Sequence, residues 1–337
     1  MNIKTGFAAA ALACTTTLAA PAFAEKLTAA HGYVPAHTVY KNGIEPWLAC
    51  VEEKTGGGIT FDHYPSGQIS GHKESVASLN NGLADVSAVI PGYEAGKLPL
   101  TNMSMLPGFG ATASDMNTSY RAMIDNESPL VAEWHKVGIH PIMPVFTPAY
   151  QILSMDEPWT TMEALKGKKI RAGGGTAVLA VASVDAVPVE MASPDMFVAL
   201  QRGTMDATIL SLTSAPAYGL PDILKSASTN GSFGSGMAVW AMSKTKYDSL
   251  SPEHQAAIDE CGRSVEVSMG ATVDAENTAL ATEFADKGIA VYEFPADVLE
   301  AINARLATVG EDYIQKLEEN GVADARKTYE MYLGVLK

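Results

Sequence analysis

The sequence predicts an α/β protein with two domains and one unusually long helix near its end. Short runs rich in β-branched and aromatic residues alternate with helical stretches along most of the chain, a pattern typical of α/β folds. Residues 251–287 differ, because they are rich in alanine and glutamate and contain no proline after Pro252. The length of 337 residues also exceeds what one hydrophobic core usually contains.

The first 24 residues are typical of a secretory signal peptide. Lys4 precedes an apolar run over residues 7–18, and Pro21-Ala22-Phe23-Ala24 resembles a cleavage site with small residues. We therefore expect export and removal of residues 1–24. A lipoprotein signal ending at Cys14 is the alternative, but the apolar run before that cysteine is very short and residues 11–13 fit such a signal poorly.

Periodicity then predicts the order of strands and helices. The expected strands cover residues 27–30, 59–64, 85–90, 142–146, 151–154, 168–172, 187–191, 207–210, 237–242 and 289–294. The expected helices between them cover residues 37–54, 73–81, 114–137, 176–183 and 194–202.

The end of the chain predicts a helix long enough to connect both domains. Ser251-Pro252-Glu253 is a helix-start signal with proline at the first position, and the helical pattern continues to about residue 287. A strand near Tyr292 and three further helices are expected to complete the fold.

Charge and cysteine content limit the classes of partner and compartment. Removal of the signal takes away Lys4 and leaves 22 basic and 38 acidic residues, a net charge of −16. We therefore expect no binding to nucleic acid or to an anionic membrane, since both require a positive surface. After the signal, no apolar run approaches the ~20 residues of a membrane span.

Cys50 and Cys261 are the two cysteines that remain after the signal. They form either a disulfide or two buried thiols, and the sequence does not choose between these alternatives.

Residues 165–177, LKGKKIRAGGGTA, form the most conspicuous candidate anion site. A phosphate-binding P-loop needs its lysine after the glycines, whereas here the lysines come first, and Gly173-Gly174-Gly175 lacks the G-x-G-x-x-G spacing of a dinucleotide site. Ser70-Gly71-His72-Lys73 matches a β-lactamase motif, but its companion motifs are absent or out of order. The seven histidines show no metal-ligand spacing, so we expect neither a metal nor a cofactor.

A carboxylate clamp built on Arg171 is the remaining interpretation of this stretch. Alternation over residues 168–171 places Ile170 and Arg171 on opposite faces of a strand, near its carboxyl end, where open α/β sheets bind ligands. The glycines then turn the chain into a helix near Thr176, a residue suited to capping, whose free N–H groups favour an anion. An internal salt bridge of Arg171 is the alternative, and spacing alone does not choose between them.

Four motifs in order resemble the periplasmic solute receptors of TRAP (tripartite ATP-independent periplasmic) transporters. The resemblance covers nearly all of the chain after the signal. The motifs are residues 52–57 with Tyr64-Pro65-Ser66-Gly67-Gln68-Ile69, residues 165–171, residues 186–189 with 199–206, and Leu250-Ser251-Pro252-Glu253.

This resemblance implies a two-lobed periplasmic-binding-protein-like α/β fold with a long helix spanning both lobes. We expect residues 25–149 and about 236–275 in the first lobe, and residues 150–235 and about 276–337 in the second. It also implies that Arg171 binds the carboxylate of an organic acid between closing lobes, and that the ligand passes to a permease of integral-membrane subunits. We expect a monomeric periplasmic protein without enzymatic activity.

Two departures from the family pattern concern the ligand. Tyr150-Gln151 stands where many members have a second arginine, and Ala207-Thr208-Ile209-Leu210 stands where many have a polar run. Because apolar walls cannot satisfy a second carboxylate, we expect a monocarboxylate with an aromatic or branched apolar body. The expected ligand-binding residues are Arg171, Gln151, Tyr33, His37, Tyr93, Phe109, Gly173, Met191, Ile209, Leu210, Thr213, Phe233 and Trp240. A secreted hydrolase of small acids and a ligand-presenting sensor subunit are the alternative functions.

Overall fold

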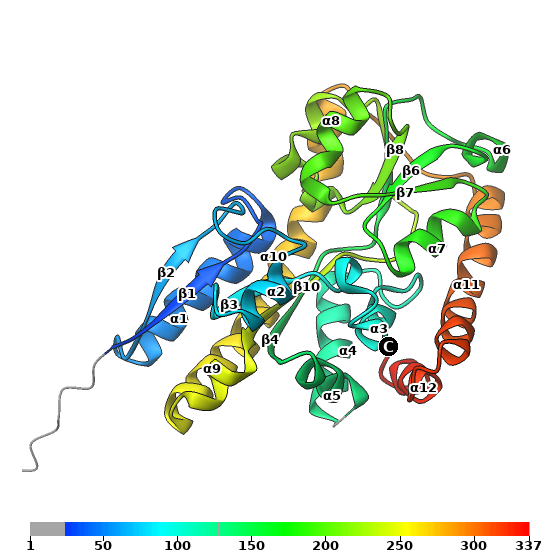
Figure 1. Cartoon of the computed structure of the whole chain (residues 1–337). Coiled ribbons are helices and arrows are strands. Elements are labelled where there is room, and N and C mark those ends of the chain that lie inside the picture. Colours follow the sequence, from blue (N-terminus) through cyan, green and yellow to red (C-terminus); the bar gives the residue numbers. More distant parts are fainter. Residues whose placement is uncertain (1–23, 127, 337) are drawn as a thin grey trace, which may run out of the picture.

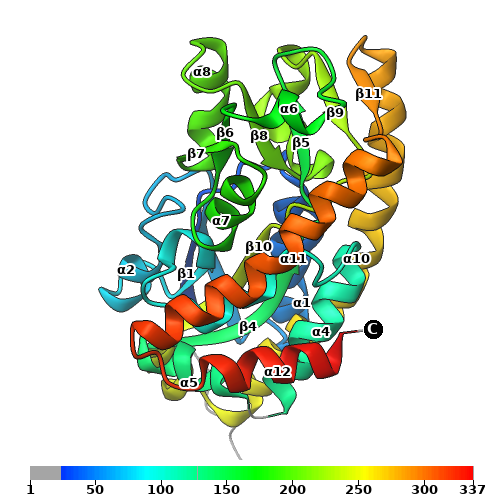
Figure 2. The same cartoon turned by 90° about the vertical axis from the view of Figure 1, so that its right-hand side faces the viewer.

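The computed structural model of the chain describes residues 24–126 and 128–336, so the expected signal peptide lies outside the described residues apart from Ala24. Two β-sheets form the centres of two α/β lobes, and a long helix runs beside both of them (Figures 1 and 2). The α/β class, the two lobes and the long helix that the sequence predicts are therefore confirmed.

The first sheet contains five strands in the order β2-β1-β3-β10-β4. Strands β1, β2 and β3 run parallel, whereas β10 is antiparallel to its neighbours β3 and β4. The strands are β1 (Glu25–Ala30), β2 (Ile59–Tyr64), β3 (Val86–Val89), β4 (Ile139–Phe146) and β10 (Met237–Ser243). Most residues of β3, β4 and β10 are buried, because helices cover this sheet.

The second sheet contains six strands in the order β11-β9-β5-β8-β6-β7. Strand β5 is antiparallel to β8 and β9, and β6 is parallel to β7 and β8. The strands are β5 (Gln151–Ser154), β6 (Lys169–Ala172), β7 (Val187–Glu190), β8 (Ala207–Leu210), β9 (Ser226–Ser228) and β11 (Ala290–Tyr292). Strand β9 was not predicted, because the three residues Ser-Ala-Ser give no β-type hydrophobic signal.

Two segments of chain cross between the lobes side by side. Residues 147–150 lead from β4 to β5, and residues 229–236 lead from β9 to β10. Backbone hydrogen bonds join them, from Thr147 N to Gly236 O (2.9 Å) and from Tyr150 N to Gly234 O (2.8 Å). The two crossing segments therefore form a short two-stranded connection that both lobes share.

The predicted helices over residues 73–81, 176–183 and 194–202 are confirmed with similar ends, whereas the short helices Pro99–Asn102, Met162–Leu165 and Lys244–Ser249 were not predicted. The predicted helix over residues 114–137 is two helices, α4 (Ala113–Asp125) and α5 (Pro129–Lys136), because Ser128 caps a new helix with Pro129 at its first position. The others are α1 (Glu45–Lys54), preceded by a π-helical turn (Tyr40–Ile44), α2 (Ser75–Asn80), α3 (Pro99–Asn102), α6 (Met162–Leu165), α7 (Thr176–Ser183), α8 (Met196–Gln201) and α9 (Lys244–Ser249). Short 3₁₀ turns cover Pro91–Glu94, Met103–Met105, Ser193–Asp195, Leu212–Ser214, Pro216–Tyr218 and Leu220–Asp222.

Helix α10 (Pro252–Asp286) is the predicted long helix and contacts both lobes. Its first half packs against α1, α4 and β4 of the first lobe, and its end reaches β11 of the second. A disulfide between Cys50 and Cys261 joins α1 to α10, with the two Cα atoms 5.8 Å apart. The sequence left a disulfide and two thiols open, and the structure shows the disulfide.

Two helices follow β11, where three were expected. Helix α11 (Ala296–Glu319) is continuous through Gly310, and α12 (Ala325–Val335) is the last. A Cβ atom at Gly310 would lie 2.7 Å from the Tyr329 hydroxyl, so this glycine allows close packing of the two helices and does not end one. Helix α12 packs against α4 beside the first sheet, although the expected boundaries placed it in the second lobe. The other lobe boundaries stay a prediction.

The hydrophobic core follows the alternation of the strands. Ile152 and Leu153 are neighbours on β5, but they belong to separate buried clusters on opposite faces of the second sheet. The larger cluster continues around the first sheet, and the smaller one includes Phe284 of α10. The long helix is therefore held by packing at both of its ends.

Loss of the disulfide is expected to lower the free energy of unfolding by about 2–4 kcal/mol, because the bond closes a loop of 211 residues in the unfolded chain. Urea unfolding of the oxidised protein and of a Cys50→Ala/Cys261→Ala variant measures the difference. A reducing agent should destabilise the natural protein and leave the double variant unchanged. Equal midpoints for the oxidised and the reduced natural protein would contradict this expectation.

Candidate functional site

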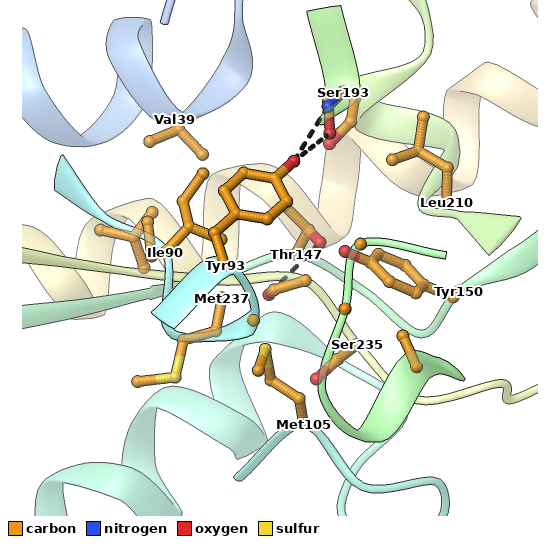
Figure 3. A pocket seen from close by; sticks show the side chains of 18 of the residues that line it. Val39, Ile90, Tyr93, Met105, Thr147, Tyr150, Ser193, Leu210, Ser235 and Met237 are labelled. Carbon is orange, nitrogen blue, oxygen red and sulfur yellow. Dashed lines mark hydrogen bonds between the residues drawn. The ribbon is translucent and has the colours of Figure 1, made fainter. Parts of the chain in front are cut away.

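A cavity that opens to solvent, with about 630 Å³ of empty space including its opening, lies between the two lobes and is lined by residues of both lobes and of the crossing segments (Figure 3). Nine of its lining residues carry hydroxyl groups: Tyr33, Tyr93, Thr147, Tyr150, Thr176, Ser193, Ser214, Tyr218 and Ser235. Its apolar lining residues include Val39, Ile90, Met105, Val145, Leu210 and Met237. The cavity therefore combines aliphatic walls with neutral hydrogen-bonding groups.

Arg171 reaches this cavity from β6 and is only 1 % exposed. Strand alternation turns Ile170 into the hydrophobic core and leaves Arg171 on the opposite face. The guanidinium Nε donates to the backbone oxygen of Met191 (3.0 Å), and Nη2 donates to the hydroxyls of Tyr93 (3.1 Å) and Ser193 (3.0 Å). Its orientation is thus fixed by neutral acceptors.

The positive charge of Arg171 has no acidic partner among residues 24–126 and 128–336. None of their carboxylates forms an ion pair with it, and its hydrogen bonds come from Nε and Nη2, which leaves Nη1 unbonded in this part of the chain. Among the described residues that line the cavity, Arg171 carries the one charged side chain. Since a buried unpaired charge is costly, this arrangement suits an external anion.

Tyr93 connects the two lobes at the mouth of the cavity. It belongs to the turn after β3, yet its hydroxyl accepts hydrogen bonds from Arg171 Nη2 and from the Ser193 backbone N–H (2.9 Å), both in the second lobe. Gly174, with φ of +99°, lies so near that an added Cβ would be 2.4 Å from the backbone oxygen of Gly92. Only glycine permits this close approach between the lobes.

Three histidines beside the cavity are held in their neutral form. Burial, followed by the nearby histidines, lowers the pKa of His31 and of His37 to about 3. Burial and then the charge of Arg171 lower the pKa of His72 to about 4. His37 Nδ1 accepts a hydrogen bond from Val39 N (3.1 Å), so the proton of its neutral ring lies on Nε2.

The tyrosine hydroxyls of the cavity also stay neutral. Burial raises the pKa of Tyr150 to about 12, against a smaller opposite effect of Arg171. Burial likewise raises the pKa values of Tyr33 and Tyr218. The cavity therefore keeps a single positive charge across the physiological pH range.

Some of the expected ligand-binding residues line this cavity together. They are Arg171, Tyr33, His37, Tyr93, Gly173 and Leu210. Helix α7 begins at Thr176 as expected, but Gly175 occupies the capping position, and the Thr176 hydroxyl is buried without a hydrogen-bond partner. The predicted capping role of Thr176 is therefore wrong, because Thr176 already has a helical backbone.

The expected aromatic partners other than the tyrosines pack in the protein interior. Phe109 stacks on Tyr329 and packs against Tyr332 of α12. Phe233 packs against Phe294, and Trp240 meets Trp47 edge to face in the first lobe. These three rings complete the core and do not line the cavity.

Four further expected residues also lie outside the lining set. Gln151 turns away and bonds to the backbone of Gly231 through both its amide nitrogen (2.7 Å) and its amide oxygen (2.9 Å). Ile209 points into the core on the opposite face from Leu210, as alternation requires. Met191 contributes its backbone oxygen to Arg171, and the Thr213 hydroxyl pairs with that of Ser211 (2.8 Å).

Several residues that line the cavity were not predicted from the sequence. Tyr150 could have been found, because it neighbours Gln151 and therefore faces the opposite side of the chain. Ser193, Ser214 and Tyr218 belong to short 3₁₀ turns, which give no periodic signal. Ser235 lies in the crossing segment between β9 and β10, which only the fold brings to the same cavity as Arg171.

Residues 24–126 and 128–336 hold no group of three or more His, Cys, Asp or Glu side chains that could bind a metal ion. None of the helices in the same part of the chain has both the length and the apolar character that a membrane span requires.

A Tyr93→Phe change is expected to open the ligand-free protein, because it removes the hydroxyl that joins Arg171 and Ser193 to the other lobe. Small-angle X-ray scattering should report a larger radius of gyration. Tyr247→Phe is the matched control. It also removes a partly buried hydrogen bond, from the tyrosine hydroxyl to Asp259 (2.6 Å), but this bond lies within one lobe. Identical scattering from the Tyr93 variant and the natural protein would refute the bridging role.

Stability is expected to fall as the pH is lowered from 7 to 5.5. Below pH 6.5 the unfolded chain binds protons on His31, His37 and His72, whereas the folded protein does not until about pH 3–4. Each histidine then removes up to about 1.4 kcal/mol of the free energy of unfolding per pH unit below 6.5. Urea unfolding at several pH values measures the slope.

Histidine NMR titration provides the accompanying check. The ring signals of these three residues should still be those of neutral imidazole at pH 5.5. His72→Gln should reduce the slope of stability against pH. A slope unaffected by the His72 change would contradict the expectation.

Several solved structures of solute-binding proteins share this fold. A marine metagenome TRAP solute binding protein specific for aromatic acid ligands, in complex with 3-hydroxybenzoate, has a TM-score of 0.85 and 20 % identity, over 93 % of this chain and 98 % of that one. A TRAP solute binding protein from Rhodoferax ferrireducens T118, with copurified benzoate, has a TM-score of 0.84 and 22 % identity, over 92 % and 97 %. Others with this fold are described with mandelate, pyroglutamic acid or malonate.

Sequence comparison agrees with the structural likeness. A solute-binding protein of Albidiferax ferrireducens is 25 % identical over 225 residues, which are 66 % of this chain and 66 % of the relative. The family model of the bacterial extracellular solute-binding proteins, family 7 (DctP), matches residues 30–316. Since this match covers most of the chain, the protein belongs to family 7 of the bacterial extracellular solute-binding proteins, the solute receptors of TRAP transporters.

Proposed function

We propose that this protein is an extracytoplasmic receptor that binds an organic monocarboxylate with an aromatic or branched apolar body. One observation carries the proposal: the lone buried charge of Arg171, without an acidic partner among the described residues, faces a cavity whose other described lining groups are neutral. A single carboxylate neutralises that charge. The planar guanidinium offers it Nη1 directly, and a pair of parallel N–H bonds forms if Nη2 shifts from its present acceptors.

The start of α7 adds to this anion site. Thr176 and Ala177 line the same cavity as Arg171 and belong to the first turn of the helix, where backbone N–H groups lack intrahelical partners. The buried Thr176 hydroxyl has no partner among the described residues and can donate to the same carboxylate. Burial of the anion beside a helix N-terminus is favourable, because the helix dipole places partial positive charge there.

The rest of the cavity favours a monoacid over a diacid. A second carboxylate would meet neutral tyrosines, Met105, Leu210 and Met237, and no second cation lines the described part of the cavity. A buried charge without a partner is far costlier than the ~1–3 kcal/mol of an unpaired polar group. By contrast, burial of ~100 Å² of ligand hydrocarbon stabilises the complex by about 2.5 kcal/mol.

The ligand class rests on these residues and not on the fold. Proteins with this fold are described with aromatic acids and also with malonate, which carries two carboxylates. The shared architecture therefore permits several acids, and the side chains around the bound acid decide among them. In this chain Tyr150, one of the two residues that stand where many family members have a second arginine, lines the cavity.

The proposed role is delivery and not chemistry. We propose that the signal peptide is removed after Ala24, that the monomeric receptor closes its lobes on the ligand without changing any bond, and that integral-membrane subunits of a TRAP permease receive it. Membership of a solute-receptor family and the Tyr93 bridge between the lobes support this sequence of events.

Arg171→Ala is expected to weaken binding of benzoate-like acids at least about 100-fold, because loss of one partner of a buried ion pair removes about 3–5 kcal/mol. Isothermal titration calorimetry measures the affinity, and circular dichroism confirms that the variant is folded. Arg202→Ala, which removes an exposed arginine of the same lobe, is the control and should bind normally. Normal affinity in the Arg171 variant would place the anion elsewhere.

Thermal-shift measurements with a panel of acids test the ligand class. Benzoate and branched aliphatic monoacids should raise the melting temperature, whereas succinate, malonate and sugar acids should not. Stabilisation by the diacids or sugar acids without any by the monoacids would refute the proposed class and leave the receptor family intact.

A further inference from the structure

Asn102, the last residue of α3 in the first lobe, has a buried amide whose oxygen lacks a hydrogen-bond partner among the described residues. The residue is 0 % exposed. Its amide nitrogen donates to the backbone oxygens of Pro91 (2.7 Å) and Leu98 (3.0 Å). Because both of these partners are acceptors, the nitrogen must face them, and the orientation of the amide is fixed. An unsatisfied buried oxygen is uncommon in proteins and requires an explanation.

Hydrogen bonds within the first lobe also fix the short helix that carries Asn102. The buried carboxylate of Glu133 on α5 accepts from the backbone N–H groups of Leu100 (2.7 Å) and Thr101 (2.8 Å), and from the Thr101 hydroxyl (2.6 Å). These bonds satisfy N–H groups at the start of α3, which have no partner inside so short a helix. The Asn102 oxygen therefore projects from a firmly held element.

This oxygen is directed at the start of α7 in the second lobe. A Cβ atom added at Gly175 would lie 2.1 Å from Asn102 Oδ1, so the oxygen lies directly against the backbone of Gly175. Helix α7 also contacts the turn Met103–Met105, which follows α3 (Figure 1). Only glycine fits at this position, because a side chain would displace the amide and because the φ of Gly175 is +57°.

Helix α7 has no capping side chain of its own at this end. Gly175 occupies the capping position, where other residue types would supply an acceptor for the first turn. The N–H of Gly175 forms no hydrogen bond within residues 24–126 and 128–336. Thr176 and Ala177 line the ligand cavity, whereas Gly175 does not. The start of the helix therefore has one side toward the ligand and another side that meets Asn102.

We propose that Asn102 is a positioning residue of the receptor: in the closed form its amide oxygen accepts the N–H of Gly175 and so caps α7 from the opposite lobe. The contact pairs an unsatisfied acceptor of one lobe with an unsatisfied donor of the other. Because Thr176 and Ala177 follow directly, the cap holds in place the N–H groups that favour the carboxylate. This inference rests on the proposed function, since it assumes that a carboxylate binds beside that helix start.

Hydrogen exchange of the Gly175 amide, followed by NMR in the ligand complex, tests the inference. The ligand is benzoate or isobutyrate, whichever raises the melting temperature more. Asn102→Ala and Asn102→Asp both lose the amide donor, but the aspartate keeps an oxygen that can accept from Gly175. The Gly175 amide should exchange at least about tenfold faster in the alanine variant than in the natural protein, and should stay slow in the aspartate variant.

Asn117→Ala is the matched control. Asn117 is also a buried asparagine of the first lobe, but its amide bonds to the Glu266 oxygen (3.0 Å) and to the Phe146 N–H (3.1 Å), both away from α7. This variant should lose stability as Asn102→Ala does, yet keep slow exchange of Gly175 and normal ligand affinity. A purely structural role of Asn102 would make the two alanine variants behave alike.

Ligand kinetics connect the cap to binding. Asn102→Ala should release the ligand about fivefold faster in stopped-flow experiments, with an unchanged association rate, because the cap forms only after the lobes close. Fast exchange of Gly175 in the complex of the natural protein, or slow exchange or normal ligand release in Asn102→Ala, would overturn the inference and leave the proposed function standing. Failure of every monoacid to bind the natural protein would instead refute the proposed function, and this inference with it.

Discussion

The site depends on the constraint that a guanidinium group buried inside the protein must have its charge compensated. Arg171 is surrounded by neutral acceptors, the hydroxyls of Tyr93 and Ser193 and the backbone oxygen of Met191, which fix its direction without cancelling its charge. An internal aspartate would have satisfied the charge and closed the site to anions. In the proposed function, this uncompensated charge is the reason that the cavity selects an acid.

Burial keeps the titratable side chains around Arg171 in their neutral forms. The same low-dielectric environment that strengthens an Arg171–carboxylate pair lowers the pKa values of His37 and His72 and raises that of Tyr150. The cavity therefore offers one positive charge and several neutral hydrogen-bonding groups. The proposed ligand, a monocarboxylate with an apolar body, matches this inventory better than a diacid does.

Residues of both lobes form the walls of the site, and the two lobes also contact each other directly. Each lobe has its own sheet, and the two crossing segments, α10 and α11 connect them. The opposed residues Gly92 and Gly174 let the lobes approach, and the Tyr93 hydroxyl spans the gap to Arg171. In the proposed function, ligand affinity and lobe closure are coupled, because the same guanidinium takes part in both.

The sequence by itself determined the α/β class, nearly all strands, the long helix and the position of Arg171 on its strand. These depend on local periodicity, on capping signals such as Ser251-Pro252 and on alternation along β6, all of which act over a few residues. Only the tertiary structure decided that Cys50 and Cys261 meet, that Phe109, Phe233 and Trp240 complete the core, and that Ser235 and Tyr218 line the same cavity as Arg171. Those outcomes depend on contacts between residues far apart in the chain, and local patterns carry no information about which distant surfaces pack together.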